Sequence, residues 1–257
     1  MNLQVVDVAV KDFVAVVTMN NPPVNAQDRR FHEGMTLAFD TLSDRDDTRC
    51  IVLTGAGKHF SAGAEIKQRA ARTWEAGDLW QHSRRTRECF LSIVECRKPV
   101  VAAINGAALG AGLAVAACCD ILVCAANTTL GLPEIDVGLL GGGRHAMRLF
   151  GHSKTRRLMF TGQRLTGPEL FRLGVVEACV PPERLLESAL EIARTIAAKS
   201  PNAIALAKHA LNTIEEMSLR DGYRFEQNMT AALGQYEDSR EAMLAFSEKR
   251  PPVFKGR

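Results

Sequence analysis

Three segments rich in small residues contain the best candidates for chemistry in this chain. They are FSAGAE at 60–65, NGAALGAG at 105–112 and GLPEIDVG at 131–138. Each of the first two follows a predicted buried strand, and the second opens an apolar helix. The N–H groups at a helix start point outward and have no partner within the helix. Small side chains leave such groups within reach of a ligand, and two of them can hold an oxygen that becomes negatively charged during a reaction.

The third segment supplies one carboxylate, Glu134, between apolar residues. Apolar surroundings raise the pKa of a carboxyl group, which can then transfer protons. For any one segment, tight packing of a strand against a helix is the simpler explanation of the glycines. The occurrence of all three segments in this order favours a chemical role.

The elements that would position these segments follow an α/β order. Two β-branched runs near the start, at 3–10 and 13–19, predict a hairpin. Helical spacing of apolar residues predicts an amphipathic helix over 28–43. Short apolar runs predict three buried strands, at 50–55, 99–105 and 120–125. Beyond residue 142 helical patterns dominate, and only 175–180 is typical of a strand.

Composition argues against several other classes of protein. The 257 residues suit one large domain, and 46% hydrophobic with 24% charged residues is typical of a globular chain. A net charge of +3 gives no argument for nucleic acid as a partner. No apolar run approaches the roughly 20 residues of a membrane span, and the N-terminus lacks a signal-peptide pattern. We therefore expect a cytoplasmic protein with neither membrane nor nucleic acid as a partner.

The seven cysteines and two glycine-rich stretches suggest no metal or nucleotide site. The cysteines are irregularly spaced without a CxxC pair, which predicts buried, reduced thiols. GAGKH at 55–59 lacks the first glycine of a phosphate-binding loop, and GGGRHA at 141–146 follows no clear strand. We expect no metal.

Taken together, these motifs resemble the crotonase superfamily, also called the enoyl-CoA hydratase/isomerase family. The resemblance covers essentially the whole chain, through motifs at 21–26, 53–67, 98–125, 130–143 and 243–257. It implies an α/β fold of stacked ββα units, here residues 1–198, followed by a helical trimerisation region at 199–257. It also implies a homotrimer or a dimer of trimers. The implied substrate is an acyl-CoA thioester, so coenzyme A arrives with the substrate and no separate cofactor is expected.

The resemblance also implies roles for individual residues. The backbone N–H groups of Ala64 and Ala111 would form an oxyanion hole for the thioester oxygen as the substrate becomes an enolate. Glu134 would be the principal acid and base. Contacts with CoA are implied at four positions, the last two matching a C-terminal Phe-Lys pair that sometimes serves a neighbouring subunit: Ala26, Ile66, Phe254 and Lys255.

One departure from the family pattern bears on the reaction. Family hydratases generally carry a second glutamate at the position of Ala114. Alanine cannot transfer a proton, so one carboxylate beside an oxyanion hole suits an isomerase, although some family hydratases use the glutamate matching Glu134 alone. We expect first an enoyl-CoA hydratase, then an enoyl-CoA isomerase that uses Glu134 as its sole acid and base. A CoA-thioester binder with little turnover is the third alternative.

A second departure is the pair Arg144 and His145, which stands where two glycines are common in the family. We expect one of them to point into the acyl pocket, to bind a polar or carboxylated acyl group or to replace the missing glutamate. Exposure on the first turn of a helix is the simpler explanation. Residues 67–90 are expected to line part of the same pocket.

Overall fold

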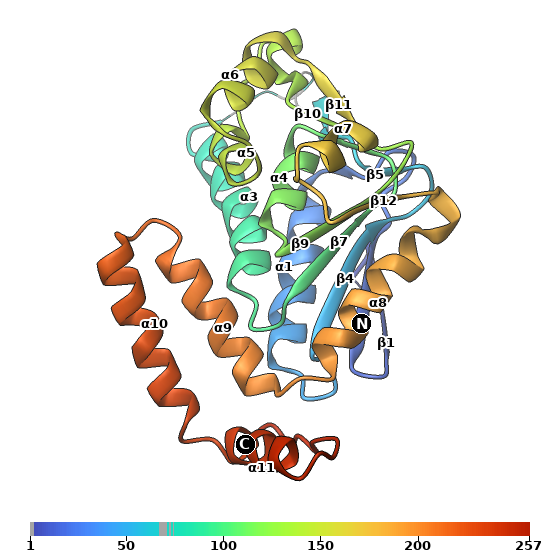
Figure 1. Ribbon diagram of the computed structural model, residues 1–257. Coiled ribbons are helices and arrows are strands. Elements are labelled where there is room, and N and C mark those ends of the chain that lie inside the picture. The colour runs from blue at the N-terminus through green and yellow to red at the C-terminus, as the bar shows by residue number, and fades with distance from the viewer. Residues whose placement is uncertain (1–2, 67–70, 72, 74) are drawn as a thin grey trace.

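The computed structural model describes residues 3–66, 71, 73 and 75–257. Its main sheet has six strands in the order β1-β2-β4-β7-β9-β12 (Figure 1). The first two pair antiparallel as the predicted hairpin, and every other neighbouring pair is parallel. The strands are β1 (Val6–Lys11), β2 (Val14–Met19), β4 (Cys50–Gly55), β7 (Val100–Ile104), β9 (Ile121–Ala125) and β12 (Ala178–Val180).

Two smaller sheets lie beside the main one. Four short strands pair in the order β11-β10-β8-β5, and β3 pairs with β6. Along the chain, β4, β7 and β9 of the main sheet are each followed by a strand of the second sheet, so three successive units stack side by side. This confirms the predicted fold of stacked ββα units. The short strands are β3 (Ala26–Gln27), β5 (His59–Ser61), β6 (Gly63–Ala64), β8 (Ala107–Leu109), β10 (Thr129–Gly131) and β11 (Arg164–Thr166).

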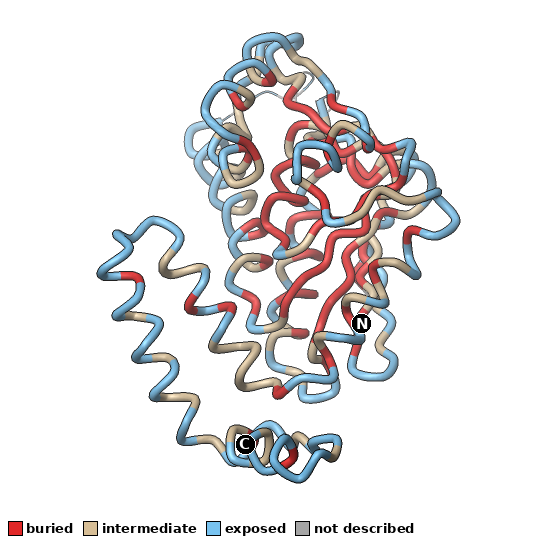
Figure 2. The backbone as a smooth tube through the Cα atoms, in the orientation of Figure 1, coloured by how far each residue is buried: buried red, intermediate tan, exposed pale blue. Residues whose placement is uncertain are grey.

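Helices cover both faces of the main sheet (Figures 1 and 2). One face packs against α1 (Arg29–Asp44), α3 (Asp78–Glu95) and α4 (Ala111–Cys118) in the larger apolar core. The other face packs against α8 (Leu185–Ala197) in a second core. Because β4, β7 and β9 are buried on both faces, their sequences are continuous apolar runs.

The remaining elements lie between or beyond these layers. A 3₁₀ turn at η1 (Pro133–Val137) follows β10, and α5 (Gly143–Leu149), α6 (His152–Thr161), α7 (Gly167–Arg172) and η2 (Pro182–Arg184) complete the central part. Then α9 (Pro201–Ile214), α10 (Leu219–Leu233) and α11 (Glu237–Ser247) extend away from the sheets, with mostly exposed or half-buried residues (Figures 1 and 2). The boundary at 198/199 lies between α8 and α9, and the division into a core and a trimerisation region stays a prediction.

Six of the seven cysteines are buried, and none forms a disulfide. Burial raises the pKa of the Cys118 thiol to about 12, so this thiol is protonated and unreactive at neutral pH. No helix in the described part of the chain is long and apolar enough to span a membrane. The same residues contain no group of three or more His, Cys, Asp and Glu side chains that could hold a metal ion.

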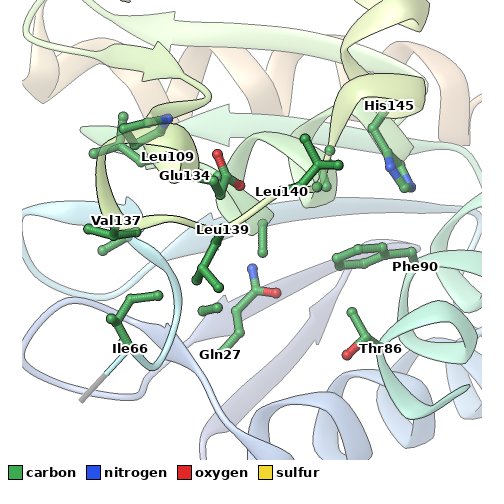
Figure 3. A pocket seen from close by; sticks show the side chains of 18 of the residues that line it. Gln27, Ile66, Thr86, Phe90, Leu109, Glu134, Val137, Leu139, Leu140 and His145 are labelled. Carbon is green, nitrogen blue, oxygen red and sulfur yellow. The ribbon is translucent and has the colours of Figure 1, made fainter. Parts of the chain in front are cut away.

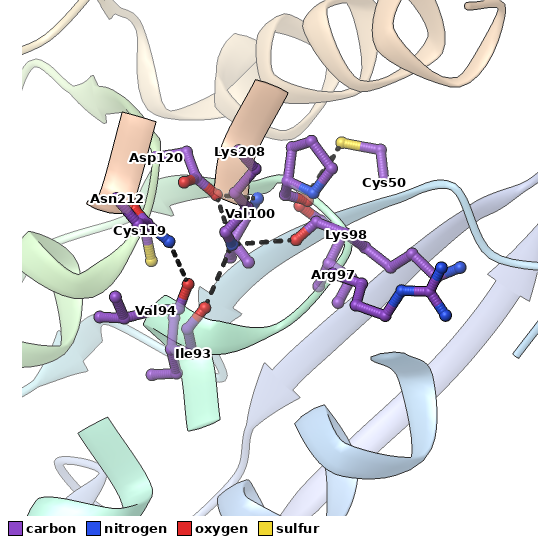
Figure 4. Close-up of polar contacts among 12 residues, drawn as sticks. Cys50, Ile93, Val94, Arg97, Lys98, Val100, Cys119, Asp120, Lys208 and Asn212 are labelled. Carbon is purple, nitrogen blue, oxygen red and sulfur yellow. Dashed lines mark hydrogen bonds and ion pairs between the residues drawn. The ribbon is translucent and has the colours of Figure 1, made fainter. Parts of the chain in front are cut away.

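A buried lysine joins α9 to the central part of the molecule (Figure 4). The Lys208 side chain is 5% exposed, and its Nζ lies 2.8 Å from Oδ2 of Asp120. The same ammonium group donates to the carbonyl oxygens of Ile93 and Lys98, at 3.2 and 3.0 Å. One turn further along α9, the amide of Asn212 donates to the Val94 carbonyl oxygen. These bonds fix the direction in which α9 leaves the core.

We expect Lys208→Met to lower the free energy of unfolding by about 3 kcal/mol, because it removes the cation that pairs with the partly buried Asp120 carboxylate and that donates to two carbonyl groups. Urea unfolding followed by circular dichroism measures the change. Lys199→Met, at an exposed lysine near the start of α9, is the matched control and should change the same quantity by about 0.5 kcal/mol or less. Equal unfolding midpoints for the two variants would contradict a structural role for Lys208.

Candidate active site

A cavity of about 420 Å³ brings the three small-residue segments together (Figure 3). Its wall includes Ala62 and Ala64 from the first segment and Gly110 and Ala111 from the second. The third segment contributes Glu134. Three stretches that are far apart in the sequence therefore face one space.

The first two segments touch because glycine stands at the points of contact. A methyl group at Gly63, where φ is +90°, would lie 2.5 Å from the Leu109 carbonyl oxygen and 3.2 Å from the Ala111 nitrogen. A side chain at Gly112 would overlap the Ser61 carbonyl oxygen. Ala111 is the first residue of α4, so its N–H has no partner within that helix. The backbones of Ala64 and Ala111 therefore lie on the same part of the cavity wall.

The Glu134 carboxyl group lies directly against this contact. A methyl group at Gly110, where φ is +56°, would be 2.5 Å from Oε1 of Glu134. The other oxygen, Oε2, is buried and has no hydrogen-bond partner. Burial raises the pKa of Glu134, against a smaller lowering by a backbone hydrogen bond. A carboxyl group that takes up a proton readily thus stands beside the start of α4.

Comparisons with known proteins agree on one family. The sequence pattern described as enoyl-CoA hydratase/isomerase matches residues 10–257. The chain belongs to the enoyl-CoA hydratase/isomerase family.

Relatives in this family resemble the chain over nearly its whole length. A Dictyostelium discoideum protein named probable enoyl-CoA hydratase, mitochondrial, is 35% identical over 248 residues, which cover 95% of this chain and 88% of the relative. The carnitinyl-CoA dehydratase of Salmonella arizonae is also 35% identical over 248 residues, covering 93% and 94%. The crystal structure of an enoyl-CoA hydratase from Bacillus anthracis superposes with a TM-score of 0.93 at 31% identity, covering 99% of this chain and all of that one.

Ala114 stands where the sequence comparison with family hydratases expects a second glutamate, so this position adds no carboxylate to the cavity wall. Ala114 lines the cavity and is 1% exposed. Among the described lining residues, the carboxylates are Glu134 and Asp136. Asp136 is exposed and lies against Gly162, where a methyl group would come within 2.7 Å of its Oδ2. Of the two carboxylates in the described wall, Glu134 is therefore the half-buried one, with its Oε2 atom buried.

The side chains of Arg144 and His145 have different surroundings. His145 lines the cavity and packs edge-on against Phe90, with ring centroids 5.1 Å apart. Burial and the nearby Arg148 and Arg144 lower the pKa of His145, which favours the neutral ring. Arg144 is not among the lining residues and forms an exposed ion pair with Glu216. Neighbouring residues of a helix point in different directions, so His145 and not Arg144 faces the cavity. A contact of either residue with the acyl group stays a prediction.

The four positions implied to contact CoA do not lie together in a single chain. Ile66 lines the cavity, and Ala26 lies in β3, paired with Gly63 beside the wall. Phe254 and Lys255 follow α11 in the chain and are not among the residues that line the cavity. The Phe254 carbonyl oxygen accepts from Arg49, and the Lys255 N–H donates to Asp238. Contacts with CoA stay a prediction at all four positions, and for the last two they would need a neighbouring subunit.

The predicted pocket segment 67–90 is described only in part. Residues 67–70, 72 and 74 lie outside the described residues. From the described part, His82, Thr86 and Phe90 of α3 line the cavity.

Two buried polar residues of the wall were not predicted from the sequence. Gln27 and His32 line the cavity, and both are buried. A signal for His32 was present, because it lies next to Phe31 and one turn before Met35 on the apolar side of the predicted helix. A polar side chain on a buried helix face requires a partner or a function.

We expect a ¹³C NMR titration to place the pKa of the Glu134 carboxyl group above the ordinary value for glutamate, because burial disfavours the charged form. Comparison with Glu134→Gln assigns the signal. A titration midpoint at or below the ordinary value would contradict the partial burial described for this carboxyl group.

Proposed function

We propose that the chain is an enoyl-CoA hydratase, which adds water to a 2-enoyl-CoA or removes it from a 3-hydroxyacyl-CoA. The observation that carries the proposal is the half-buried Glu134 carboxyl group, whose buried Oε2 has no partner, beside the backbones of Ala64 and Ala111 in one cavity. Family relatives named as enoyl-CoA hydratases support the same reaction.

In the proposed reaction the thioester oxygen accepts hydrogen bonds from the N–H groups of Ala64 and Ala111. Glu134 removes a proton from water as the water oxygen bonds to C3, and the electron pair of the double bond moves toward the thioester to give an enolate. The two N–H groups stabilise its negative oxygen, and one such donor typically contributes about 10²–10³ in rate. The protonated Glu134 then delivers its proton to C2, so one carboxyl group serves as base and then as acid.

An isomerase is the second candidate, and Ala114 is the observation that favours it. Transfer of a proton from C2 to C4 of a 3-enoyl-CoA needs an oxyanion hole and one carboxylate, but no group to orient water. The same arrangement would also serve a CoA-thioester binder with little turnover, which is the third candidate.

Incubation with crotonyl-CoA and with a 3-enoyl-CoA in ¹⁸O water distinguishes these reactions. We expect the conjugated enoyl absorbance of crotonyl-CoA to fall and the product to gain one heavy oxygen atom. Conversion of the 3-enoyl ester without heavy oxygen, and no hydration of crotonyl-CoA, would instead identify an isomerase. Binding of both esters with no conversion of either would contradict both enzymatic candidates.

We expect Glu134→Gln to lower kcat by at least about 10²-fold while leaving the affinity for an acyl-CoA nearly unchanged, because the amide cannot accept the proton. Glu183→Gln, at an exposed carboxylate outside the cavity, is the matched control and should keep its activity. Unchanged turnover in Glu134→Gln would remove this residue from the mechanism.

We also propose that the chain assembles as a homotrimer or a dimer of trimers through its C-terminal helices. Large apolar side chains on α9–α11 are exposed in the single chain, with Leu219 at 91% and Phe246 at 87%. Such a surface is typical of an interface. Analytical ultracentrifugation should give three or six times the mass of one chain, and a monomer would contradict the assembly.

The remaining parts of the proposal rest on the family resemblance and on the expectations drawn from the sequence. They are a cytoplasmic enzyme of fatty-acid metabolism that needs no cofactor beyond the CoA of its substrate.

A further inference from the structure

Two buried polar side chains in the cavity wall have atoms without hydrogen-bond partners. Gln27 is 2% exposed and His32 is 3% exposed. Neither Oε1 of Gln27 nor either ring nitrogen of His32 has a partner. A buried polar atom without a partner costs free energy, and such atoms are uncommon in folded proteins. Both residues line the cavity that contains Glu134, so a bound acyl group can supply the missing partners.

The fold fixes the Gln27 side chain in place. Its Nε2 donates to Oγ of Ser61 at 3.2 Å, and that hydroxyl donates to the Asn25 carbonyl oxygen at 2.7 Å. These hydrogen bonds fix the orientation of the Gln27 amide group, and its Oε1 remains an acceptor without a partner. In Figure 3 the amide extends between Ile66 and Leu139 on one side and Phe90 and Thr86 on the other.

The neighbours of His32 leave its ring free to bind. His32 lies in the second turn of α1, and its ring centroid is 5.9 Å from that of His82 on α3. The Thr86 hydroxyl is already used, since it donates to the His82 carbonyl oxygen at 3.0 Å. The part of the wall formed by β3 and α1 therefore offers the Gln27 amide oxygen and the His32 ring. Ile66, Leu139 and Leu140 line apolar parts of the wall.

We propose that Gln27 and His32 form a subsite for a hydroxyl group on the acyl chain, beyond the carbons that react. An amide oxygen only accepts, so its partner must be a donor, and a neutral imidazole offers one donor and one acceptor. A hydroxyl group can donate to Oε1 of Gln27 and accept from an N–H of His32. A methyl group can do neither. The subsite rests on the proposed function, because it names the class of acyl group that the same cavity takes.

The environment of the subsite favours a neutral group over a carboxylate. Burial, with a smaller contribution from His82, lowers the pKa of His32 to about 4, so the ring is uncharged at neutral pH. A carboxylate has no proton to donate to Oε1 of Gln27. Arg164 is the arginine among the described lining residues, and it is exposed.

Binding of saturated acyl-CoA esters tests the subsite without any turnover. We would measure by calorimetry the affinity of the full chain for hexanoyl-CoA and octanoyl-CoA, and for their analogues hydroxylated at single carbons beyond C3. At least one hydroxylated ester is expected to bind roughly tenfold or more tightly than its parent. Equal or weaker binding of every hydroxylated ester would overturn the proposal, because ordered water would then satisfy the two side chains.

Single-residue variants test whether Gln27 and His32 cause the preference for a hydroxylated ester. Gln27→Leu and His32→Phe are each expected to reduce the roughly tenfold preference to near one. Gln163→Leu is the matched control, since Oε1 of Gln163 is also buried without a partner but lies outside the cavity lining. This control should keep the preference, and its loss there would overturn the assignment. The comparison of esters on the unmodified chain decides the matter even where a variant fails to fold.

The outcomes separate the subsite from the proposed reaction. A preference for a hydroxylated ester with no incorporation of heavy oxygen would contradict the proposed reaction and support the subsite. Hydration of enoyl esters with no such preference would support the proposed reaction and contradict the subsite. If Gln27→Leu lowered kcat equally for plain and hydroxylated enoyl esters and left binding unchanged, Gln27 would act on the reacting water, and the proposal would be wrong.

Discussion

The close approach of the Ser61–Ala64 segment to the start of α4 is the contact on which the rest of the site depends. Side chains at positions 63 and 112 would collide with the opposite backbone, so glycine at both positions lets the two segments touch. This contact places the Ala64 and Ala111 backbones on one wall. It also places the start of α4, at Gly110 and Ala111, in the cavity wall. The small residues thus serve the packing and the proposed chemistry at once.

The same constraint determines the environment of Glu134. Because Gly110 has no side chain, the carboxyl group packs directly against the backbone that precedes Ala111. The side chain is half-buried there, which raises the pKa of the carboxyl group, and its buried Oε2 has no partner. Ala114, on the next turn of α4, adds only a methyl group to this wall. The cavity therefore combines one half-buried carboxyl group with backbone donors, and two buried polar side chains, Gln27 of β3 and His32 of α1, lie elsewhere in its wall.

Much of this arrangement could be predicted from the sequence, because strong local patterns encode it. The helix predicted over 28–43 is α1 at Arg29–Asp44, where Asp28 caps the helix by accepting from the Phe31 N–H. The buried strands β4, β7 and β9 followed from their continuous apolar runs. The short strands β5, β8 and β10 have three residues each, too few to show an alternating pattern.

Other features depend on tertiary contacts that no local pattern records. The direction of Arg144 depends on how α5 is rotated against its neighbours, and the ion pair with Glu216 joins residues 72 positions apart. Gln27 is an ordinary polar residue in the sequence, and the apolar neighbours of His32 indicate only that its side chain is buried. The fold alone shows that Oε1 of Gln27 and both ring nitrogens of His32 lack partners.

A crystal structure of the chain with an unreactive acyl-CoA analogue bound would show whether Ala64 and Ala111 form the oxyanion hole. We predict that the thioester oxygen lies about 2.7–3.1 Å from the backbone nitrogens of both residues. It also predicts that the Glu134 carboxyl group faces C2 and C3 of the acyl chain. A thioester oxygen bound elsewhere, with either nitrogen out of hydrogen-bond range, would contradict the proposed oxyanion hole and the mechanism built on it.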